Sequence, residues 1–148
     1  DSTPVAVAGG SSTICQNASF TVSNTYYKDG WIQWTHNGQG TLSNANTLTP
    51  TYSAHSLDAG NTINLKMVVS SNNSCTPLKD SAYYYVTVDR LPQATIAGSS
   101  TICANGSYQI PQNAATTNYG SMLWTKPSSA SGYISAGVNT LQPTYVAG

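Results

Sequence analysis

An internal duplication is the feature that most limits how this chain can fold. The segment from Pro4 reads PVAVAGGSSTICQNASFTV, and the segment from Pro92 reads PQATIAGSSTICANGSYQI. Cys15 and Cys103 therefore occupy equivalent positions, 88 residues apart. A match of this length indicates a tandem repeat, in which each copy is one structural unit.

Two further blocks extend the match in the same order. The block around Trp34 corresponds to the block around Trp124 at an offset of 90 residues. The block at residues 47–52, TLTPTY, corresponds to TLQPTY at residues 140–145, at an offset of 93. The offset grows only between matched blocks, where loops accept insertions.

The offsets place one complete repeat at residues 1–90, opening on a linker from a preceding repeat, and a truncated second repeat at residues 91–148. The second repeat lacks counterparts of Thr62–Ser70 and Ala82–Val88, the last two strands expected in the first. We expect the protein to continue in both directions, because a sandwich without two strands would expose apolar faces and unpaired edges. The sequence leaves open what stabilises the truncated repeat and how many repeats the whole protein has.

The strand signals predict an all-β fold. Thr, Val, Ile and Tyr suit a pleated surface, and apolar residues alternate with polar ones. The Asn37-Gly38 pair is a hairpin-type turn signal. Short strands separated by turns predict a Greek-key β-sandwich of the immunoglobulin-like kind in each repeat. The strands expected in the first repeat are Val5–Val7, Thr13–Ile14, Ala18–Ser23, Gly30–His36, Thr41–Leu42, Thr47–Tyr52, Thr62–Ser70 and Ala82–Val88.

Two of the three tryptophans are predicted to lie in the core. Trp34 shares strand parity with Ile32, and its equivalent Trp124 recurs in the second repeat, which favours a buried position in both. Parity places Trp31 on the opposite face, and the second repeat has no tryptophan there. An exposed aromatic patch that could stack on sugar rings is one interpretation of Trp31 with Tyr26, Tyr27 and Tyr84. Packing against a loop or a neighbouring repeat is the other.

Three cysteines are disulfide candidates: Cys15, Cys75 and Cys103. Cys15 enters the second strand, whereas Cys75 lies in the loop between the last two strands, so the two are expected at opposite ends of the sandwich. A disulfide requires Cα atoms within about 7 Å. We therefore favour bonds between neighbouring repeats over a Cys15–Cys75 bond, with free thiols as the third alternative. Whether the disulfides lie within a repeat or between repeats, the partner of Cys103 is expected beyond this chain.

No residue pattern predicts catalysis, and we expect no enzyme, cofactor or metal in this segment. Charged residues make up 7% of the chain, five acidic and five basic, so no basic surface for nucleic acid can form. No apolar run is long enough to enter a membrane. His36 and His55 occur outside metal-ligand spacings and are expected at the surface. Asp58 is expected to cap a corner rather than bind calcium.

The order of motifs resembles the PKD-like and immunoglobulin-like repeats of Bacteroidetes cell-surface proteins, such as the giant SprB-type adhesins of gliding flavobacteria. The resemblance lies in the runs P-x-A-x-A-G-x-S-T-I-C, W-T, T-L-x-P-T-Y and D-A-G. It implies export by the type IX secretion machinery, an extracellular location at the cell surface associated with the outer membrane, and a role in adhesion or gliding motility. It also implies O-glycosylation at Ser81, in Asp80-Ser81-Ala82, and with a looser match at Ser2.

Three functions are compatible with these features. The first is a structural stalk whose partners are neighbouring repeats of the same chain and, at the tip, a surface polysaccharide or substratum. The second is a carbohydrate-binding module, and the third is an accessory domain of a secreted hydrolase. The sequence does not identify the ligand, and it does not say whether an enzyme domain lies elsewhere in the parent chain.

Overall fold

The computed structural model describes residues 2–74, 77–111 and 115–148. The chain divides into two compact units, Asp1–Arg90 (unit 1) and Leu91–Gly148 (unit 2). Both units are built of β-strands, and a single 3₁₀ turn, η1 (Ser56–Asp58), is the one helical element of the described residues. The expected all-β class is confirmed.

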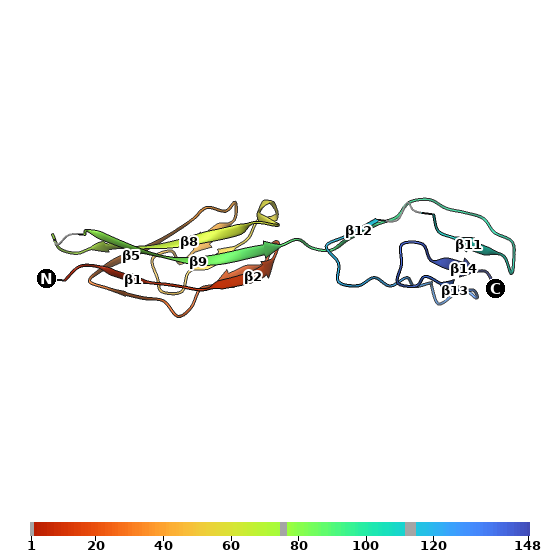
Figure 1. Cartoon of the computed structure of the whole chain (residues 1–148), viewed down its shortest axis with the longest axis horizontal. Helices are drawn as coiled ribbons and strands as arrows, with labels where there is room; N and C mark the ends of the chain where they lie inside the picture. The colour runs from red at the N-terminus through yellow and green to blue at the C-terminus, as the bar shows by residue number, and fades with distance from the viewer. Residues whose placement is uncertain (1, 75–76, 112–114) are drawn as a thin grey trace. The chain divides into compact units, whose positions relative to one another are not determined.

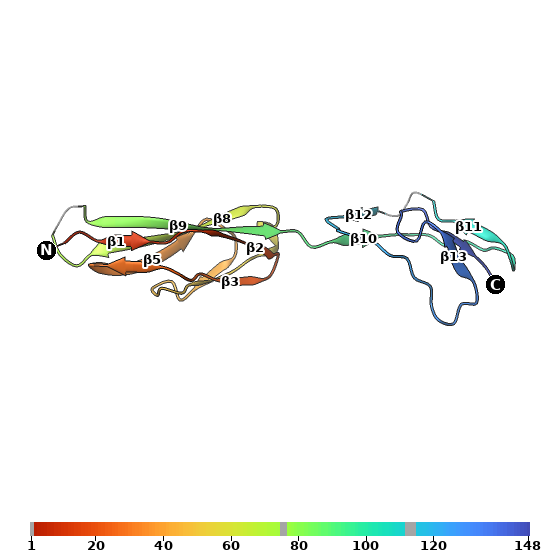
Figure 2. The ribbon, with the colours of Figure 1, turned by 60° about the horizontal axis from the view of Figure 1, so that its bottom comes forward.

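The described residues of unit 1 form nine strands in three sheets. Figures 1 and 2 show how the labelled ones are arranged. A four-stranded sheet has the order β2-β9-β8-β5, a three-stranded sheet has the order β3-β7-β6, and β1 pairs with β4. The turned view of Figure 2 places β3 on the opposite side of the unit from β8 and β9. The strands are β1 (Val5–Val7), β2 (Ser11–Cys15), β3 (Ser19–Thr21), β4 (Tyr26–Lys28), β5 (Gly30–His36), β6 (Thr41–Ser43), β7 (Thr51–Ser53), β8 (Thr62–Ser71) and β9 (Lys79–Asp89).

The core of unit 1 lies between the four-stranded and three-stranded sheets. Every second residue of β8 is apolar and buried, and β9 adds its own alternate residues near its end. Tyr52 from β7 closes the core from the other layer. Burial of one face of each sheet fixes the register, because a slip by one residue would turn the apolar set outward. The fully buried strand side chains include Trp34, Tyr52, Leu65, Met67, Val69, Val86 and Val88.

Two strand predictions need correction. The strand β4 was missed, because the positive φ angles of Asn24 and Asp29 limit it to three residues. The predicted strand Thr47–Tyr52 is wrong over its first four residues, because the strand observed there is Thr51–Ser53. At the start of the predicted strand, the Thr47 amide and hydroxyl both donate to the Asn44 carbonyl, at 3.1 and 2.9 Å. Such local bonds to side chains compete with a strand ladder.

The Asn37-Gly38 pair does not form the predicted hairpin. The strands on either side of it pair with different partners, β5 with β8 and β6 with β7. The chain therefore crosses from one layer to the other at this point, and Asn37 Oδ1 accepts a hydrogen bond from the Asn64 amide at 2.8 Å. Glycine is required at residue 38 because a Cβ there would collide with the Tyr52 hydroxyl.

Unit 2 repeats five of these strands. They are β10 (Gln93–Thr95), β11 (Ser107–Gln109), β12 (Ala115–Thr117), β13 (Tyr133–Ala136) and β14 (Thr144–Val146), which occupy the sequence positions of β1, β3, β4, β6 and β7. Their pairing is also repeated, since β10 pairs with β12 and the order β11-β14-β13 matches β3-β7-β6.

Hydrogen bonds at equivalent positions make the duplication visible at atomic level. The Trp34 indole donates to the Thr47 carbonyl at 3.0 Å, and the Trp124 indole donates to the Thr140 carbonyl at 2.7 Å. Backbone bonds repeat in the same way. The sequence repeat is therefore also a repeat of local structure. The matched backbone pairs are Val22→Pro50 with Ile110→Pro143, Trp34→Ala45 with Trp124→Val138, and Ala54→Ala18 with Ala147→Gly106.

Trp124 departs from the prediction of a core tryptophan in both repeats. Trp34 is 1% exposed and lies within β5, whereas Trp124 is only half-buried and lies outside any strand. The reason is that Trp34 lies beside Met67, its cross-strand neighbour on β8, and both belong to the core. Unit 2 has no strand equivalent to β8 among its described residues.

Candidate ligand-binding face

The outer face of the four-stranded sheet is the surface of unit 1 best suited to a ligand. Its side chains alternate with the core residues along each strand. Few of them are charged, namely Lys66 on β8 and Lys79 and Asp89 at the two ends of β9. Three are large exposed aromatics: Trp31 at 54%, Tyr85 at 43% and Tyr83 at 40% exposure. The face comprises Trp31, Gln33 and Thr35 of β5, Asn64, Lys66 and Val68 of β8, and Ser81, Tyr83 and Tyr85 of β9.

Tyr83 and Tyr85 form an aromatic pair at one end of this face. Their ring centroids are 6.4 Å apart and the ring planes differ by 11°. The Lys66 ammonium lies 5.7 Å from the Tyr83 ring centroid, within the range of a cation–π contact. Asn64 lies directly opposite Tyr85 in the register. Apolar ring faces next to amide and ammonium donors are the groups that could stack on a sugar ring and hydrogen-bond its hydroxyls.

Trp31 lies on the same face as the tyrosine pair but at a distance from it. Lys66 is opposite both Thr35 and Tyr83, whereas Trp31 is opposite Ser70. Four residues along β5 correspond to about 13 Å. A ligand that contacts Trp31 and Tyr83 together must therefore span several sugar rings.

The predicted aromatic patch of Trp31, Tyr26 and Tyr27 is only partly present. Tyr26 is 53% exposed, but it lies on β4, opposite Val7 of β1. Tyr27 is wrong as a ligand-facing residue, because the alternation of β4 turns it toward the core, against which it packs.

Tyr84, weighed as a member of the same patch, also faces the core. Its ring stacks on Phe20 at 5.4 Å between centroids, and its hydroxyl lies 2.8 Å from the Ser12 hydroxyl. The sequence does indicate the orientation of the tyrosines on either side of it. Because Val86 and Val88 mark the buried parity of β9, the sequence pattern is sufficient to place Tyr83 and Tyr85 on the outer face.

Asp58 and Tyr52 form a buried polar pair beneath the crossing between the layers. The Tyr52 hydroxyl donates to Asp58 Oδ2 at 2.7 Å, and the Asp58 carboxylate also accepts from the Gln39 amide at 2.7 Å and the His55 amide at 2.8 Å. Asp58 is 1% exposed. Its predicted role in capping the corner is confirmed, because it completes the capping box of η1 with the exposed His55.

The pKa values of this pair move in opposite directions. Burial raises the pKa of Asp58, but the hydrogen bonds from Gln39, Tyr52 and His55 outweigh it and hold the pKa below its usual value. Burial, with the hydrogen bond to Asp58 and its negative charge, raises the pKa of Tyr52 to about 12. The pair is therefore a carboxylate and a neutral phenol across the ordinary pH range, which suits structure rather than proton transfer.

His36 is less accessible than predicted. It is half-buried, its ring lies 5.1 Å from the Tyr52 ring between centroids, and its Nδ1 atom is buried with no hydrogen-bond partner among the described residues. The cause is its position at the end of β5, where the chain crosses above Tyr52.

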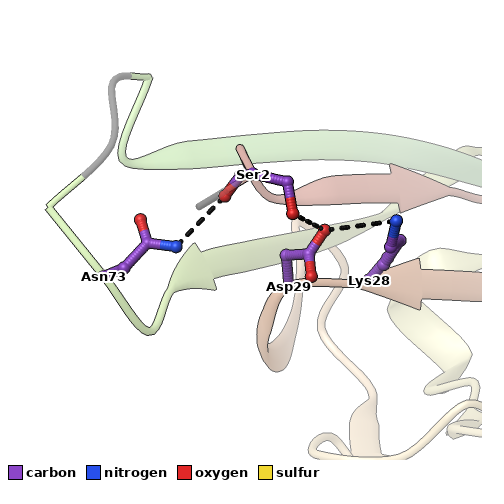
Figure 3. A network of polar contacts seen from close by, with 4 residues as sticks. All are labelled: Ser2, Lys28, Asp29 and Asn73. Carbon is purple, nitrogen blue, oxygen red and sulfur yellow. Dashed lines mark hydrogen bonds and ion pairs between the residues drawn. The ribbon is translucent and has the colours of Figure 1, made fainter.

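Ser2, one of the two predicted glycosylation sites, belongs to a small polar network (Figure 3). Its hydroxyl donates to Asp29 Oδ2 at 2.5 Å, its carbonyl accepts from the Asn73 side chain at 3.1 Å, and Lys28 lies 3.7 Å from the same Asp29 oxygen. The N-terminal segment, the end of β4 and the residues after β8 thus meet at one end of unit 1. Ser81, the other predicted site, is exposed on the outer face of β9.

Cys15 and Cys103 are both exposed, and neither forms a disulfide within the described residues. Cys15 is opposite Asp89 at the end of β9, whereas the β8–β9 loop begins at the other end of that strand, next to Lys79. Ten residues of extended chain between Lys79 and Asp89 correspond to about 33 Å. Cys75 lies outside the described residues, and bonds between repeats stay a prediction.

Within residues 2–74, 77–111 and 115–148, no three His, Cys, Asp or Glu side chains gather as a metal site would require. The helices of that same part of the chain include none with the length and apolar character needed to cross a bilayer.

Comparison with known protein families gives no matching family model, and comparison with curated proteins gives no match. Among solved structures, the chain is similar to a nucleoside hydrolase-related hypothetical protein from Saccharophagus degradans that is associated with carbohydrate metabolism. The similarity covers 60% of this chain and 25% of that one, at 18% identity and a TM-score of 0.44. The chain thus spans about a quarter of the length of that protein.

Proposed function

We propose that the chain is a structural segment of a larger secreted cell-surface protein, in which PKD-like or immunoglobulin-like repeats resist pulling. The observation that carries the proposal is the parallel pairing of β2 with β9, from Ser11 opposite Tyr85 to Cys15 opposite Asp89. One strand lies near the start of unit 1 and the other at its end. A force that separates the two ends therefore acts along both strands, and their hydrogen bonds must break together.

The finer fold assignment and the location are part of the same proposal. A fully buried tryptophan on a long strand of one sheet is typical of the immunoglobulin-like sandwich, and Trp34 occupies that position. Tandem duplication is typical of extended surface proteins. Export by the type IX machinery, a place at the outer membrane and a role in adhesion or gliding follow from the resemblance of the repeat motifs.

Single-molecule pulling tests the mechanical role. With handles at Ser2 and Arg90 of the whole chain, we expect unit 1 to unfold in one event at a high force. The matched control pulls on Asn61 and Arg90, which lie at the same end of the antiparallel β8–β9 pair. There the bonds open one after another, so the unfolding force should be markedly lower. Equal forces in the two geometries would contradict the proposal.

A carbohydrate-binding role is a second candidate, favoured by the exposed aromatics of the outer face. On a glycan array, Trp31→Ala and Tyr83→Ala should each weaken binding about tenfold, because each removes a stacking surface worth about 1.4 kcal/mol. Tyr26→Ala removes a similarly exposed ring from β4 and should leave binding unchanged. Absence of any glycan binding by the unaltered chain would exclude this candidate.

A further inference from the structure

In unit 1, the strands β8 and β9 lie in the middle of the four-stranded sheet, between β2 and β5. The strand β2 pairs only with β9, and β5 pairs only with β8. The ladder hydrogen bonds of β2 and β5 are therefore all made with this one hairpin. Without it, neither strand would have a neighbour in its sheet.

Unit 2 contains the sequences equivalent to β2 and β5, but its described residues include no hairpin between them. At the offsets of 88 and 90, β2 corresponds to residues 99–103 and β5 to residues 120–126. Both segments are described by the structure, and neither forms a strand. The five strands that unit 2 does form are those whose partners in unit 1 lie outside the hairpin. The two segments thus present backbone groups that unit 1 uses for pairing.

An open apolar surface adjoins these two segments. One hollow is lined by Ile102, Tyr108, Ile110 and Tyr145, and another by Ile110, Trp124, Ile134 and Tyr145. Their equivalents in unit 1 are core residues: Val22 for Ile110, Trp34 for Trp124 and Tyr52 for Tyr145, each at most 1% exposed. In unit 2 all three are only half-buried. What covers them in unit 1 is the apolar face of β8 and β9, made of Ile63, Leu65, Met67, Val69, Val86 and Val88.

We propose that this surface of unit 2 is a binding site for a β-hairpin with the chemistry of β8–β9. The hairpin inserts between residues 99–103 and 120–126, parallel to the first segment and antiparallel to the second. Its backbone pairs with both edges, as in other cases of strand addition. Apolar side chains at alternate positions of both strands fill the two hollows.

Unit 1 is the argument for this occupant, because it contains the same scaffold with such a hairpin in place. The strand order β3-β7-β6 and three backbone hydrogen bonds that flank it recur in unit 2, so that part of the scaffold has the same local structure in both units. The hairpin of unit 1 cannot serve, because Leu65, Met67 and Val69 are completely buried in its own core. The occupant is therefore a further hairpin of that pattern.

The test adds a peptide of residues 61–90, with Cys75→Ser to prevent oxidation, to the 148-residue chain. Hydrogen exchange is then measured at the amides of residues 99–103 and 120–126. We expect exchange there to slow by at least about tenfold, toward the protection of β2 and β5 in unit 1. A control peptide carrying Leu65→Asp and Met67→Asp keeps its length but loses the apolar face, and it should give no protection.

A second experiment uses no free peptide, so aggregation of the peptide cannot affect its result. A copy of residues 55–90 is joined after Gly148, so that the hairpin follows β14 as β8 and β9 follow β7. The same amides should become protected, and the fluorescence of Trp124 should shift to the blue, measured with Trp31 and Trp34 replaced by Phe. Unchanged exchange in both arrangements would overturn the proposal. Protection of these amides in the chain alone, through dimer formation, would overturn the assigned occupant in favour of a second copy.

Discussion

Trp34→Ala should lower the unfolding free energy of unit 1 by about 3–5 kcal/mol, the usual cost of truncating a large buried aromatic side chain. Trp34 is 1% exposed and lies opposite Met67 in the β5–β8 register. The surrounding strands are held by their ladders and cannot collapse into the space. The substitution also leaves the Thr47 carbonyl without the indole donor that lies 3.0 Å away.

The two other tryptophans provide controls within the same chain. Trp31→Ala removes a side chain that is 54% exposed, and it should change the stability of unit 1 by no more than about 0.5 kcal/mol. Trp124→Ala should leave unit 1 unaffected, because Trp124 belongs to unit 2. Amide exchange of β8, followed at Leu65 and Met67, reports unit 1 alone. Equal losses for Trp34→Ala and Trp31→Ala would contradict the assignment of Trp34 to the core.

The sequence predicted best where burial enforces a period. Alternation gave β5 from Gly30 to His36 with its bounds as observed, and it gave β8 to within one residue. These strands have one face in the core, so an apolar residue at each second position is a physical requirement. The prediction failed where local hydrogen bonds decide, as at Asn44 and Thr47, whose turn replaces the first four residues of an expected strand.

The candidate site was predictable only in part. Parity alone placed Trp31 on the outer face, and the same rule applied to β9 would have added Tyr83 and Tyr85. The pairing of β2 with β9 could not be predicted, because it joins residues more than seventy positions apart, and alternation carries no information about which strands are neighbours. The half-buried state of Trp124 could not be predicted either. Trp34 and Trp124 are equivalent in sequence, but the described residues of unit 2 include no strand equivalent to β8.

The buried pair of Asp58 and Tyr52 should make unit 1 lose stability at both ends of the pH range. The folded pKa of Asp58 is depressed, so its contribution is complete above the unfolded value of about 3.9 and is lost as the pH falls through the folded pKa. The folded pKa of Tyr52 is raised to about 12, so its contribution is complete below the unfolded value of about 10 and is lost as the pH rises toward 12. The acid limb of the stability profile, the loss at low pH, is therefore due to Asp58. The alkaline limb, the loss at high pH, is due to Tyr52.

Substitution separates the two limbs. Asp58→Asn should cost about 2–4 kcal/mol at pH 7, because it places an amide donor among the buried donors of Gln39, His55 and Tyr52. It should also flatten the acid limb. Tyr52→Phe keeps the ring, should cost about 1–3 kcal/mol through the lost hydroxyl, and should remove the loss between pH 10 and pH 12. Urea titrations at pH 3, 7 and 11, followed by the exchange of β8 amides, measure all three effects.

The control for these substitutions is Asp80→Asn, since Asp80 accepts a bond from the Ala6 amide at 2.8 Å but lies outside the pair. It should leave the alkaline limb unchanged. If Tyr52→Phe left that limb intact, another group would be responsible for it, and the pair would not be the element that links the stability of unit 1 to pH. If Asp58→Asn were as stable as the unaltered chain at pH 7, the donors around residue 58 would have found other acceptors, and the carboxylate would not hold the crossing between the two layers.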